Sequence, residues 1–311
     1  MIVTDDNASS DGSVAIMQSA RRVRRSRAHD AKHARDVSDI NLEIVSLDDV
    51  IVHEGIDPRR VERLVASLQR DGVLRSPPIV TRASDYGQTR YIVLDGATRT
   101  SALRELGYRD ALVQVVEYSS QNVSLHSWYH LLEGISPVDL LTQVRELPVR
   151  VILMHLYDAL EAMDDRTLIC VIGMRDRTVL GIQAEGDFVA QNAMLNRVVD
   201  VYRGNATVHR VTTTQFDVLF HEHPNLAALV VFPDYAPSEV TRLALGGNLI
   251  PMGITRHLIG GRALSVNFDL GILASAMSLE EKNNFLNDWL MSRVRERKVR
   301  YYGEPVFVFE D

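Results

Sequence analysis

The segment at residues 90–108 constrains the fold of this chain more than any other stretch. Its sequence is R-Y-I-V-L-D-G-A-T-R-T-S-A-L-R-E-L-G-Y, and the apolar run at residues 91–94 predicts a buried strand. Asp95 and Gly96 then predict a tight turn. The apolar residues that follow share one face of a helix, which Gly107 ends. The segment is therefore expected to be a strand, a turn and the N-terminus of a helix.

Such a junction suits a phosphate group. The first backbone N–H groups of a helix lack intrahelical partners and lie at the positive end of its dipole. Thr98, Arg99 and Thr100 would add two hydroxyls and a guanidinium there. On these residues alone, an equally good interpretation is that Asp95 caps the helix and Gly96 permits the turn.

The length and charge of the chain limit the remaining possibilities. A chain of 311 residues with 46% hydrophobic residues can form two domains with substantial cores. The net charge of −7 argues against a protein that coats nucleic acid. No run of about 18 apolar residues predicts a membrane span, and the N-terminus does not resemble a signal peptide. The expected location is the cytoplasm.

The single cysteine, Cys170, lies in the apolar run T-L-I-C-V-I-G. A buried strand thiol is the favoured interpretation over a nucleophile. One cysteine also excludes disulfides within the chain and a cysteine metal cluster. The H-E-H run at residues 221–223 lacks a third metal ligand at suitable spacing and is interpreted as surface.

Residues 1–41 are polar and predict a disordered tail. The tail contains the arginine-rich run R-R-V-R-R-S-R at residues 21–27. This run could contact nucleic acid, a membrane or an acidic partner, or it could simply be a solvated charged segment.

Residues 42–120 predict a compact α+β domain. Alternation at residues 43–47 indicates a strand, and Asp57-Pro58 provides the N-cap and first position of a helix that ends at Asp71-Gly72. A β-hairpin, the helix after Gly96 and a strand at residues 111–118 follow. Glu54 is expected on a loop between elements.

Residues 121–311 predict a second, mixed α/β lobe without repeats. Helices are expected at residues 133–147, 188–203, 238–245 and 279–297. Strands are expected at residues 168–173, 178–182, 208–212, 226–232, 262–268 and 301–309. The apolar segment L-I-P-M-G-I-T-R-H at residues 249–257 reads as a loop between a helix and a strand.

The first domain resembles the ParB/sulfiredoxin N-terminal fold. The resemblance rests on the order of a short strand, a helix ending in D-G, the motifs L-R-S-P-P-I-V and Y-I-V-L-D-G-x-x-R, and a helix ending L-G-Y. Sulfiredoxins carry a catalytic cysteine in the motif G-C-H-R, where this chain has Gly96-Ala97-Thr98-Arg99, and this difference excludes that branch. The G-E-R-R box of chromosome-partitioning ParB proteins is missing, which argues against a partition role.

The chain is most similar to a third branch, the free L-serine kinases. The shared landmarks run in order along the chain: H-E at residues 53–54, S-W-x-H at residues 127–130, P-x-G-I-T-R at residues 251–256 and G-G-R at residues 260–262. The resemblance implies phosphorylation of free L-serine, or a close hydroxy amino acid, to O-phosphoserine with ATP or ADP and Mg²⁺. Siderophore or other specialised biosynthesis is the implied setting, and the oligomeric state is left open.

The resemblance also assigns expected roles to residues. Glu54 would be the general base, and Asp95 would bind Mg²⁺ or position the phosphates. The expected phosphate-binding residues are Asp95, Gly96, Ala97, Thr98, Arg99 and Thr100. The expected amino-acid-binding residues are Trp128, His130, Thr255, Arg256 and His257. A guanidinium such as that of Arg256 can hold a carboxylate through two parallel hydrogen bonds.

One position departs from the kinase pattern. The kinases usually carry a histidine immediately before the arginine of D-G-x-H-R, where this chain has Thr98. Threonine can donate to a phosphate oxygen but carries no positive charge. An alternative function therefore stays open, a ParB-like nucleotide-binding regulator without kinase activity that contacts DNA through its arginine-rich tail.

Overall fold

The computed structural model of the chain describes residues 40–300. The predicted tail up to residue 39, with its arginine-rich run, and the predicted strand at residues 301–309 lie outside this range. Within residues 40–300, no helix has both the length and the apolar character needed to cross a membrane.

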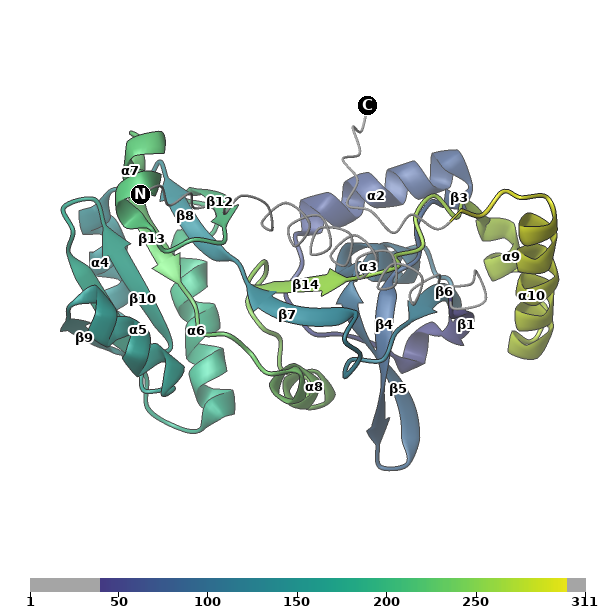
Figure 1. The fold of residues 1–311 in the computed structure, drawn as a ribbon, viewed down its shortest axis with the longest axis horizontal. Coiled ribbons are helices and arrows are strands. Elements are labelled where there is room, and N and C mark those ends of the chain that lie inside the picture. Colours follow the sequence, from purple (N-terminus) through teal and green to yellow (C-terminus); the bar gives the residue numbers. More distant parts are fainter. Residues whose placement is uncertain (1–39, 301–311) are drawn as a thin grey trace, which may run out of the picture. The chain divides into compact units, whose positions relative to one another are not determined.

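A mixed five-stranded sheet forms the N-terminal domain (Figure 1), with the strand order β1-β6-β4-β5-β2. The pairs β4–β6 and β2–β5 are parallel, and the other two pairs are antiparallel. The α+β order predicted from the sequence is confirmed. The elements of this part are β1 (Leu42–Ser46), the 3-10 helix η3 (Leu47–Asp49), β2 (Val50–Val52), α2 (Pro58–Asp71), β3 (Val73–Leu74), β4 (Ile79–Asp85), β5 (Gln88–Asp95), α3 (Ala97–Glu105) and β6 (Asp110–Val115).

Helix α2 begins and ends where the sequence predicts. The side chain of Asp57 accepts a hydrogen bond from the backbone of Arg59, and Pro58 takes the first helical position. Gly72 ends the helix in the left-handed conformation, with φ of 66°. The start of the helix at Asp57-Pro58 ends the loop that follows β2, and this loop carries Glu54.

A second, six-stranded sheet is antiparallel throughout and has the order β12-β8-β13-β10-β11-β9. Its strands and the helices around them form the predicted α/β lobe. The elements are β8 (Tyr129–Glu133), α4 (Pro137–Arg145), β9 (Arg150–Leu153), α5 (Leu156–Asp164), β10 (Cys170–Met174), β11 (Val179–Gln183), α6 (Phe188–Tyr202), β12 (Thr207–Val211), α7 (Phe216–Glu222), β13 (Leu226–Val231) and α8 (Pro237–Leu245).

Helices cover both faces of this sheet. Alternate residues of a strand point to opposite faces, and both faces carry apolar side chains that the helices bury. In β8, Leu132 joins the apolar cluster of α4, α6 and α8, whereas Leu131 joins the cluster of α5 and α7. Cys170 is fully buried in the first of these clusters. Its prediction as a buried strand thiol is confirmed, and burial raises the pKa of the thiol.

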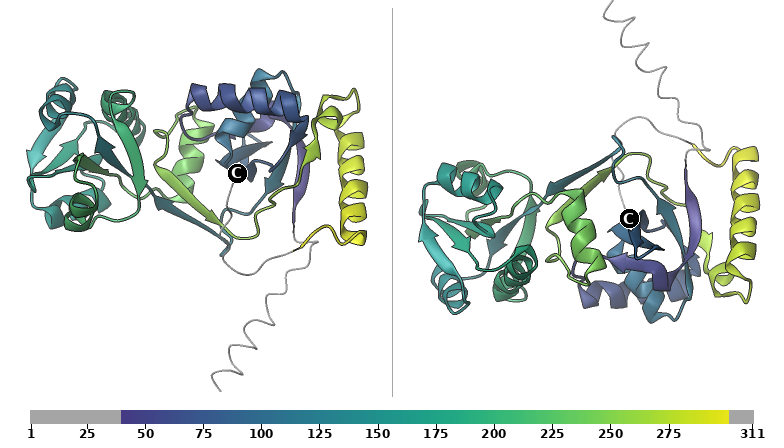
Figure 2. Two further views of the ribbon diagram at one scale, coloured as in Figure 1. Left: turned by 90° about the horizontal axis from the view of Figure 1, so that it is seen from above. Right: turned by 90° about the horizontal axis from the view of Figure 1, so that it is seen from below.

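The C-terminal part of the described chain returns to the first domain. Strand β15 (Phe268–Asp269) pairs with β3, and α9 (Leu270–Ala274) and α10 (Leu279–Arg295) follow it. Phe268, Leu273 and Leu286 lie in the same core as strands β1 and β6. Figure 2 shows α10, in yellow, beside the purple strand β1, and Asn283 exchanges two hydrogen bonds with the backbone of Ile44.

This packing differs from the expected division at residue 121, which placed everything after that point in the second lobe. The core contacts group residues 268–289 with the first domain. The sequence predicted a long helix at residues 279–297, but it contains no information about which core the apolar side chains of this helix join.

Three expected elements also differ. The helix expected at residues 133–147 begins only at Pro137, because Glu133 ends strand β8 and Ser136 caps α4. The strand expected at residues 262–268 is reduced to the two residues of β15. The expected loop at residues 249–257 contains the start of strand β14 (Thr255–Ile259), which pairs with β7 (Val123–Ser127).

Candidate active site

The turn between β5 and α3 depends on Gly96. Its φ is +98°, and a Cβ atom at this position would lie 2.9 Å from side-chain atoms of Arg99 and 3.0 Å from Cα of Pro78. Gly96 is the N-cap of α3, and no side chain caps the first turn. The first N–H groups of α3 are therefore not occupied by a capping side chain, as a phosphate site requires.

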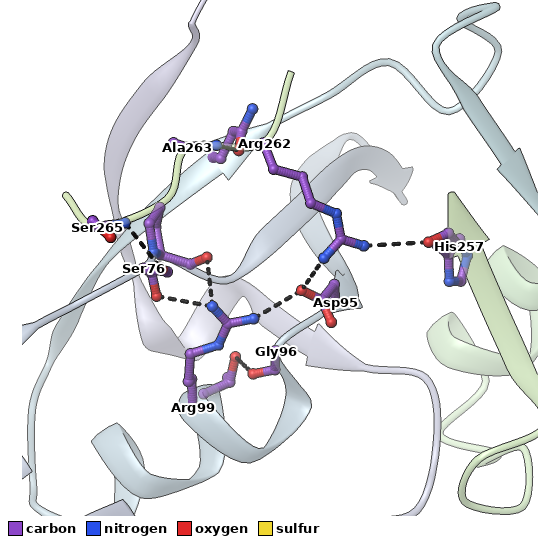
Figure 3. A network of polar contacts seen from close by, with 11 residues as sticks. Ser76, Asp95, Gly96, Arg99, His257, Arg262, Ala263 and Ser265 are labelled. Atoms are coloured by element: carbon purple, nitrogen blue, oxygen red, sulfur yellow. Dashed lines mark hydrogen bonds and ion pairs between the residues drawn. The ribbon is translucent and has the colours of Figure 1, made fainter. Parts of the chain in front are cut away.

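Asp95 does not cap α3 but lies between two arginines (Figure 3). Its Oδ2 atom accepts hydrogen bonds from Arg99, at 2.8 Å, and from Arg262, at 3.0 Å. Arg99 also donates to the carbonyls of Ser76 and Pro77. Much of the hydrogen-bonding capacity of Arg99 is therefore used to hold Asp95 and the loop before β4, which qualifies its expected role as a phosphate ligand.

Thr100 does not take the expected position beside a phosphate. Its hydroxyl donates to the carbonyl of Gly96, and the residue is only 1% exposed. One turn of helix places Thr100 over the core, whereas Thr98 lines an open cavity.

Glu54 follows β2 on the predicted loop and faces the segment around β14. Its Oε2 atom accepts a hydrogen bond from the hydroxyl of Thr255 at 2.9 Å and a longer one, 3.4 Å, from the backbone of Gly253. The bridge between Glu54 and Ile250 and the backbone hydrogen bonds of His53 and Gly55 with Ile250 fix this approach.

His53 and His257 are both buried beside this contact. The Nε2 atom of His53 lies 2.8 Å from the hydroxyl of Thr255, and the rings of the two histidines meet edge to face at 5.3 Å. Burial lowers the pKa of His53, although the negative charge of Glu54 opposes the shift. Burial lowers the pKa of His257 to about 3, and its Nε2 atom is bonded to Tyr118. His257 nevertheless lines the larger cavity described below, so its expected substrate-binding role stays a prediction.

Arg256 and Trp128 form one wall of the site. The guanidinium of Arg256 lies 4.7 Å from the centre of the Trp128 ring, a distance at which the ring face attracts a cation. Arg256 belongs to β14, and Trp128 directly follows β7, which pairs with β14. Sequence-distant residues thus form this wall through a single strand pair.

His130 differs from its expected position in the pocket. It is 3% exposed, with Nδ1 bonded to the hydroxyl of Tyr202 and Nε2 to the carbonyl of Gly253. Burial lowers its pKa to about 4. Strand β8 turns this side chain into the core of the second lobe, where it supports the backbone next to the site.

Two adjoining cavities, of about 360 and 240 Å³, meet at these residues. Both are lined by Glu54, Asp95, Gly96, Ala97 and Arg210. The larger cavity also includes Trp128, Thr255, Arg256 and Arg262, and the smaller one also includes Asp57, Arg60, Thr98 and Arg99.

Arg210 is a site residue that the sequence did not indicate. It lies on β12 as an ordinary residue of an alternating strand, V-H-R-V, and only the tertiary structure brings it to the cavities. Within residues 40–300 its side chain has no hydrogen bond or ion pair, whereas its backbone belongs to the pairing of β12 with β8. Desolvation lowers its pKa, and the nearby carboxylate of Glu54 partly offsets this shift. An unpaired cation at this position is suited to an anionic ligand.

The residues at the turn are compatible with a magnesium ion. Mg²⁺ in nucleotide sites is usually held by one or two carboxylates together with phosphate oxygens and water. The Oδ2 atom of Asp95 is shared by two arginines, while Oδ1 has no bond within the described part of the chain. The H-E-H run at residues 221–223 was interpreted as surface, and His221 and Glu222 are indeed exposed on α7.

Known proteins resemble the chain in sequence and in fold. The ParB N-terminal domain family matches residues 26–128. The ATP-dependent L-serine kinase SbnI of Staphylococcus aureus is 25% identical over 273 residues, which cover 87% of this chain and 97% of the relative. An ATP-dependent L-serine kinase of Staphylothermus marinus is 32% identical over 108 residues, covering 35% of this chain and 42% of that protein.

A solved structure of a free serine kinase in complex with AMP superposes with a TM-score of 0.65 at 17% identity. The match covers 75% of this chain and 94% of the other. The expected fold class and the expected resemblance to the free serine kinases are therefore confirmed.

Proposed function

We propose that this chain is a kinase that transfers a phosphoryl group from a nucleotide to the hydroxyl of free L-serine. The proposal rests on three features that line the two adjoining cavities. They are the carboxylate of Glu54, the uncapped N-terminus of α3 after Gly96, and the wall formed by Arg256 and Trp128. The similarity to L-serine kinases along most of the chain supports the same conclusion.

Phosphoryl transfer requires mainly in-line positioning and neutralisation of phosphate charge. The turn between β5 and α3 would receive the phosphates of ATP or ADP on the N–H groups of Ala97, Thr98 and Arg99. Asp95, fixed by Arg99 and Arg262, would hold Mg²⁺ through its free oxygen. The ion, when bound, supplies charge neutralisation at the phosphates.

The amino acid would bind against the second wall. Arg256 would hold the carboxylate of serine through its guanidinium, which the ring of Trp128 orients. The hydroxyl of Thr255 is bonded inside the protein, so this role would fall to Arg256 rather than to Thr255. Arg210, shared by both cavities, would lie near the phosphoryl group between donor and acceptor.

Glu54 would accept the proton of the serine hydroxyl as its oxygen attacks phosphorus. In this arrangement the nucleotide belongs to the domain at residues 42–120, supported by the returning segment from β15 to α10, and the acceptor is held by β14 and Trp128. Thr98 in the phosphate turn would contribute a neutral hydroxyl donor.

Incubation of the full chain with L-serine, Mg²⁺ and either ATP or ADP, followed by mass spectrometry, tests the proposal. The expected product is O-phosphoserine, formed with at least one of the two donors. A chain that yields no product across a panel of nucleotide donors and hydroxy amino acids would exclude the kinase. Salt-sensitive DNA binding that depends on residues 1–39 would then favour the regulator.

A further inference from the structure

His53, Thr255 and Glu54 form a continuous polar array next to the larger cavity. The hydroxyl oxygen of Thr255 lies 2.8 Å from Nε2 of His53 and 2.9 Å from Oε2 of Glu54. His53 continues the array to the carbonyl of Val93, which its Nδ1 atom contacts. Two of the three side chains follow β2, and the third begins β14, so the array joins the two sides of the site.

The hydrogen atoms in this array can be counted. A carbonyl only accepts hydrogen bonds, so Nδ1 of His53 must carry a proton for the contact with Val93. Burial lowers the pKa of His53 and favours the neutral ring, whose Nε2 atom is then an acceptor. Nε2 of His53 and ionised Oε2 of Glu54 are therefore both acceptors, and the hydroxyl of Thr255 between them has one hydrogen to donate.

One of the two contacts of Thr255 thus lacks a hydrogen when Glu54 is ionised. A proton added to Glu54 completes both contacts, because the carboxyl group donates to Thr255 and Thr255 donates to His53. Both contacts of Thr255 are therefore hydrogen bonds only when the array carries one proton more than it does with Glu54 ionised. This is the property required of a group that takes up the proton of a substrate hydroxyl.

We propose that Thr255 and His53 form a hydrogen-bond relay behind Glu54 that stabilises its carboxyl group once it has accepted the proton of the acceptor hydroxyl, an inference that rests on the proposed kinase function. The serine oxygen forms its bond to phosphorus while the bond between phosphorus and the leaving nucleotide oxygen breaks and its electron pair leaves with the nucleotide. The serine proton moves to Glu54, whose O–H then donates to Thr255 as the Thr255 hydroxyl turns to His53. After product release, the proton passes from Glu54 to water.

Glu54 is the catalytic residue in this scheme, because it meets the substrate, and Thr255 and His53 are positioning residues. The charged and titratable groups around the array are Arg210 beside Glu54, His257 beside His53, and Arg262 beside His257. The side-chain bonds of Arg262 run to Asp95 and to the carbonyl of His257, so they do not supply the missing hydrogen.

The first test needs no turnover. In Glu54→Gln, the amide N–H can donate to Thr255, whose hydroxyl then donates to His53, as in the protonated array. The ¹⁵N spectrum of histidine-labelled full chain should show His53 with its proton on Nδ1, and Glu54→Gln should shift the Nε2 signal in the direction of a stronger accepted hydrogen bond. The double variant with Thr255→Val should abolish this response. An Nε2 signal that Glu54→Gln leaves unchanged would overturn the relay.

The second test uses turnover and a matched pair of substitutions. Thr255→Ser keeps the hydroxyl, whereas Thr255→Val keeps the shape and removes it. We expect kcat to fall roughly 10- to 100-fold in Thr255→Val and to stay within about threefold in Thr255→Ser, with the KM of the nucleotide unchanged in both. The dependence of kcat on the deuterium content of the solvent should be curved in the parent chain and in Thr255→Ser, but linear in Thr255→Val.

The outcomes separate the two proposals. If the parent chain forms no O-phosphoserine, the proposed kinase function is excluded, and the proposed role of the relay is excluded with it, whatever the spectra show. If the parent chain forms O-phosphoserine and Thr255→Val is as active as Thr255→Ser, the relay is excluded and the proposed kinase function stands.

Discussion

The guanidinium of Arg210 occupies the space that a side chain at Gly253 would fill. A Cβ atom at Gly253 would lie 2.5 Å from Nη2 of Arg210, and Gly253 has a φ of +80°. The carbonyl of the same glycine is bonded to His130, and its N–H is directed to Glu54. The absence of a side chain at Gly253 thus allows an arginine from β12 to reach both cavities.

Gly253→Ala is therefore expected to displace Arg210. The loss of a charged contact to a substrate anion should lower kcat/KM roughly 10- to 100-fold, and Arg210→Gln should have a similar effect. Gly260→Ala is the matched control, because a Cβ atom there would meet only atoms at 3.7 Å or more and its φ is not in the left-handed range. Steady-state kinetics would contradict the prediction if Gly253→Ala and Gly260→Ala behaved alike.

Glu54→Gln is expected to remove the base and preserve the binding sites. Positioned general bases contribute roughly 10²- to 10⁴-fold, so kcat should fall by that factor, while the Kd of the nucleotide measured by calorimetry should stay within about threefold. Glu62→Gln, on the exposed side of α2, controls for the loss of one negative charge. Near-normal turnover of Glu54→Gln would exclude Glu54 as the base.

Arg256→Lys is expected to weaken serine binding selectively. Lysine retains the charge but loses the planar fork that binds a carboxylate through two hydrogen bonds and stacks on Trp128. The KM of serine should rise roughly 10-fold or more, and the KM of the nucleotide should not change. A rise confined to the KM of the nucleotide would place Arg256 at the other substrate.

The buried histidines predict a loss of stability in mild acid. The pKa values of His130 and His257 are lowered to about 4 and about 3 by burial, whereas histidine in an unfolded chain titrates near 6.5. Below pH 6.5 the unfolded chain binds protons that the folded chain does not. The stability present above pH 6.5 is therefore lost as the pH falls towards 4.

The expected loss is about 2 kcal/mol for each of these histidines at pH 5, relative to pH 7.5. Urea unfolding at the two pH values measures it. His257→Gln should reduce the difference between the two free energies of unfolding. His126→Gln, at an exposed position, should not. Equal free energies of unfolding at both pH values in the parent chain would contradict the prediction that the buried histidines destabilise the folded chain in mild acid.

The sequence predicted the first domain well because its boundaries carry strong local signals. Asp57-Pro58, Asp71-Gly72 and Asp95-Gly96 punctuate runs with clear helical or strand periodicity, and the structure follows them. The second lobe was predicted less completely. The short elements β9, α5 and α7 were not predicted, and the start of β14 was predicted as a loop because its strand character comes from pairing with β7.

The candidate site was also predicted only in part. Glu54, Asp95, Trp128 and Arg256 line the larger cavity, as the predicted site requires. His130 does not, because sequence position near a junction does not determine which way a strand residue points.

Arg210 was missed for a related reason. Its approach to the cavities is set by how β12 pairs with β8 in the second sheet, a relationship between segments that lie more than 70 residues apart. Nothing in the neighbourhood of Arg210 along the chain marks it as a site residue.

The return of β15, α9 and α10 to the first domain has a consequence for synthesis on the ribosome. Lys282 is 2% exposed and forms an ion pair with Asp110 on β6, and Leu286 lies in the core with β1. The N-terminal domain therefore lacks part of its core until the last part of the described chain has emerged. The second lobe, by contrast, has all of its strands by residue 231. The lobe made later can fold first, and the N-terminal domain is then the final unit to close.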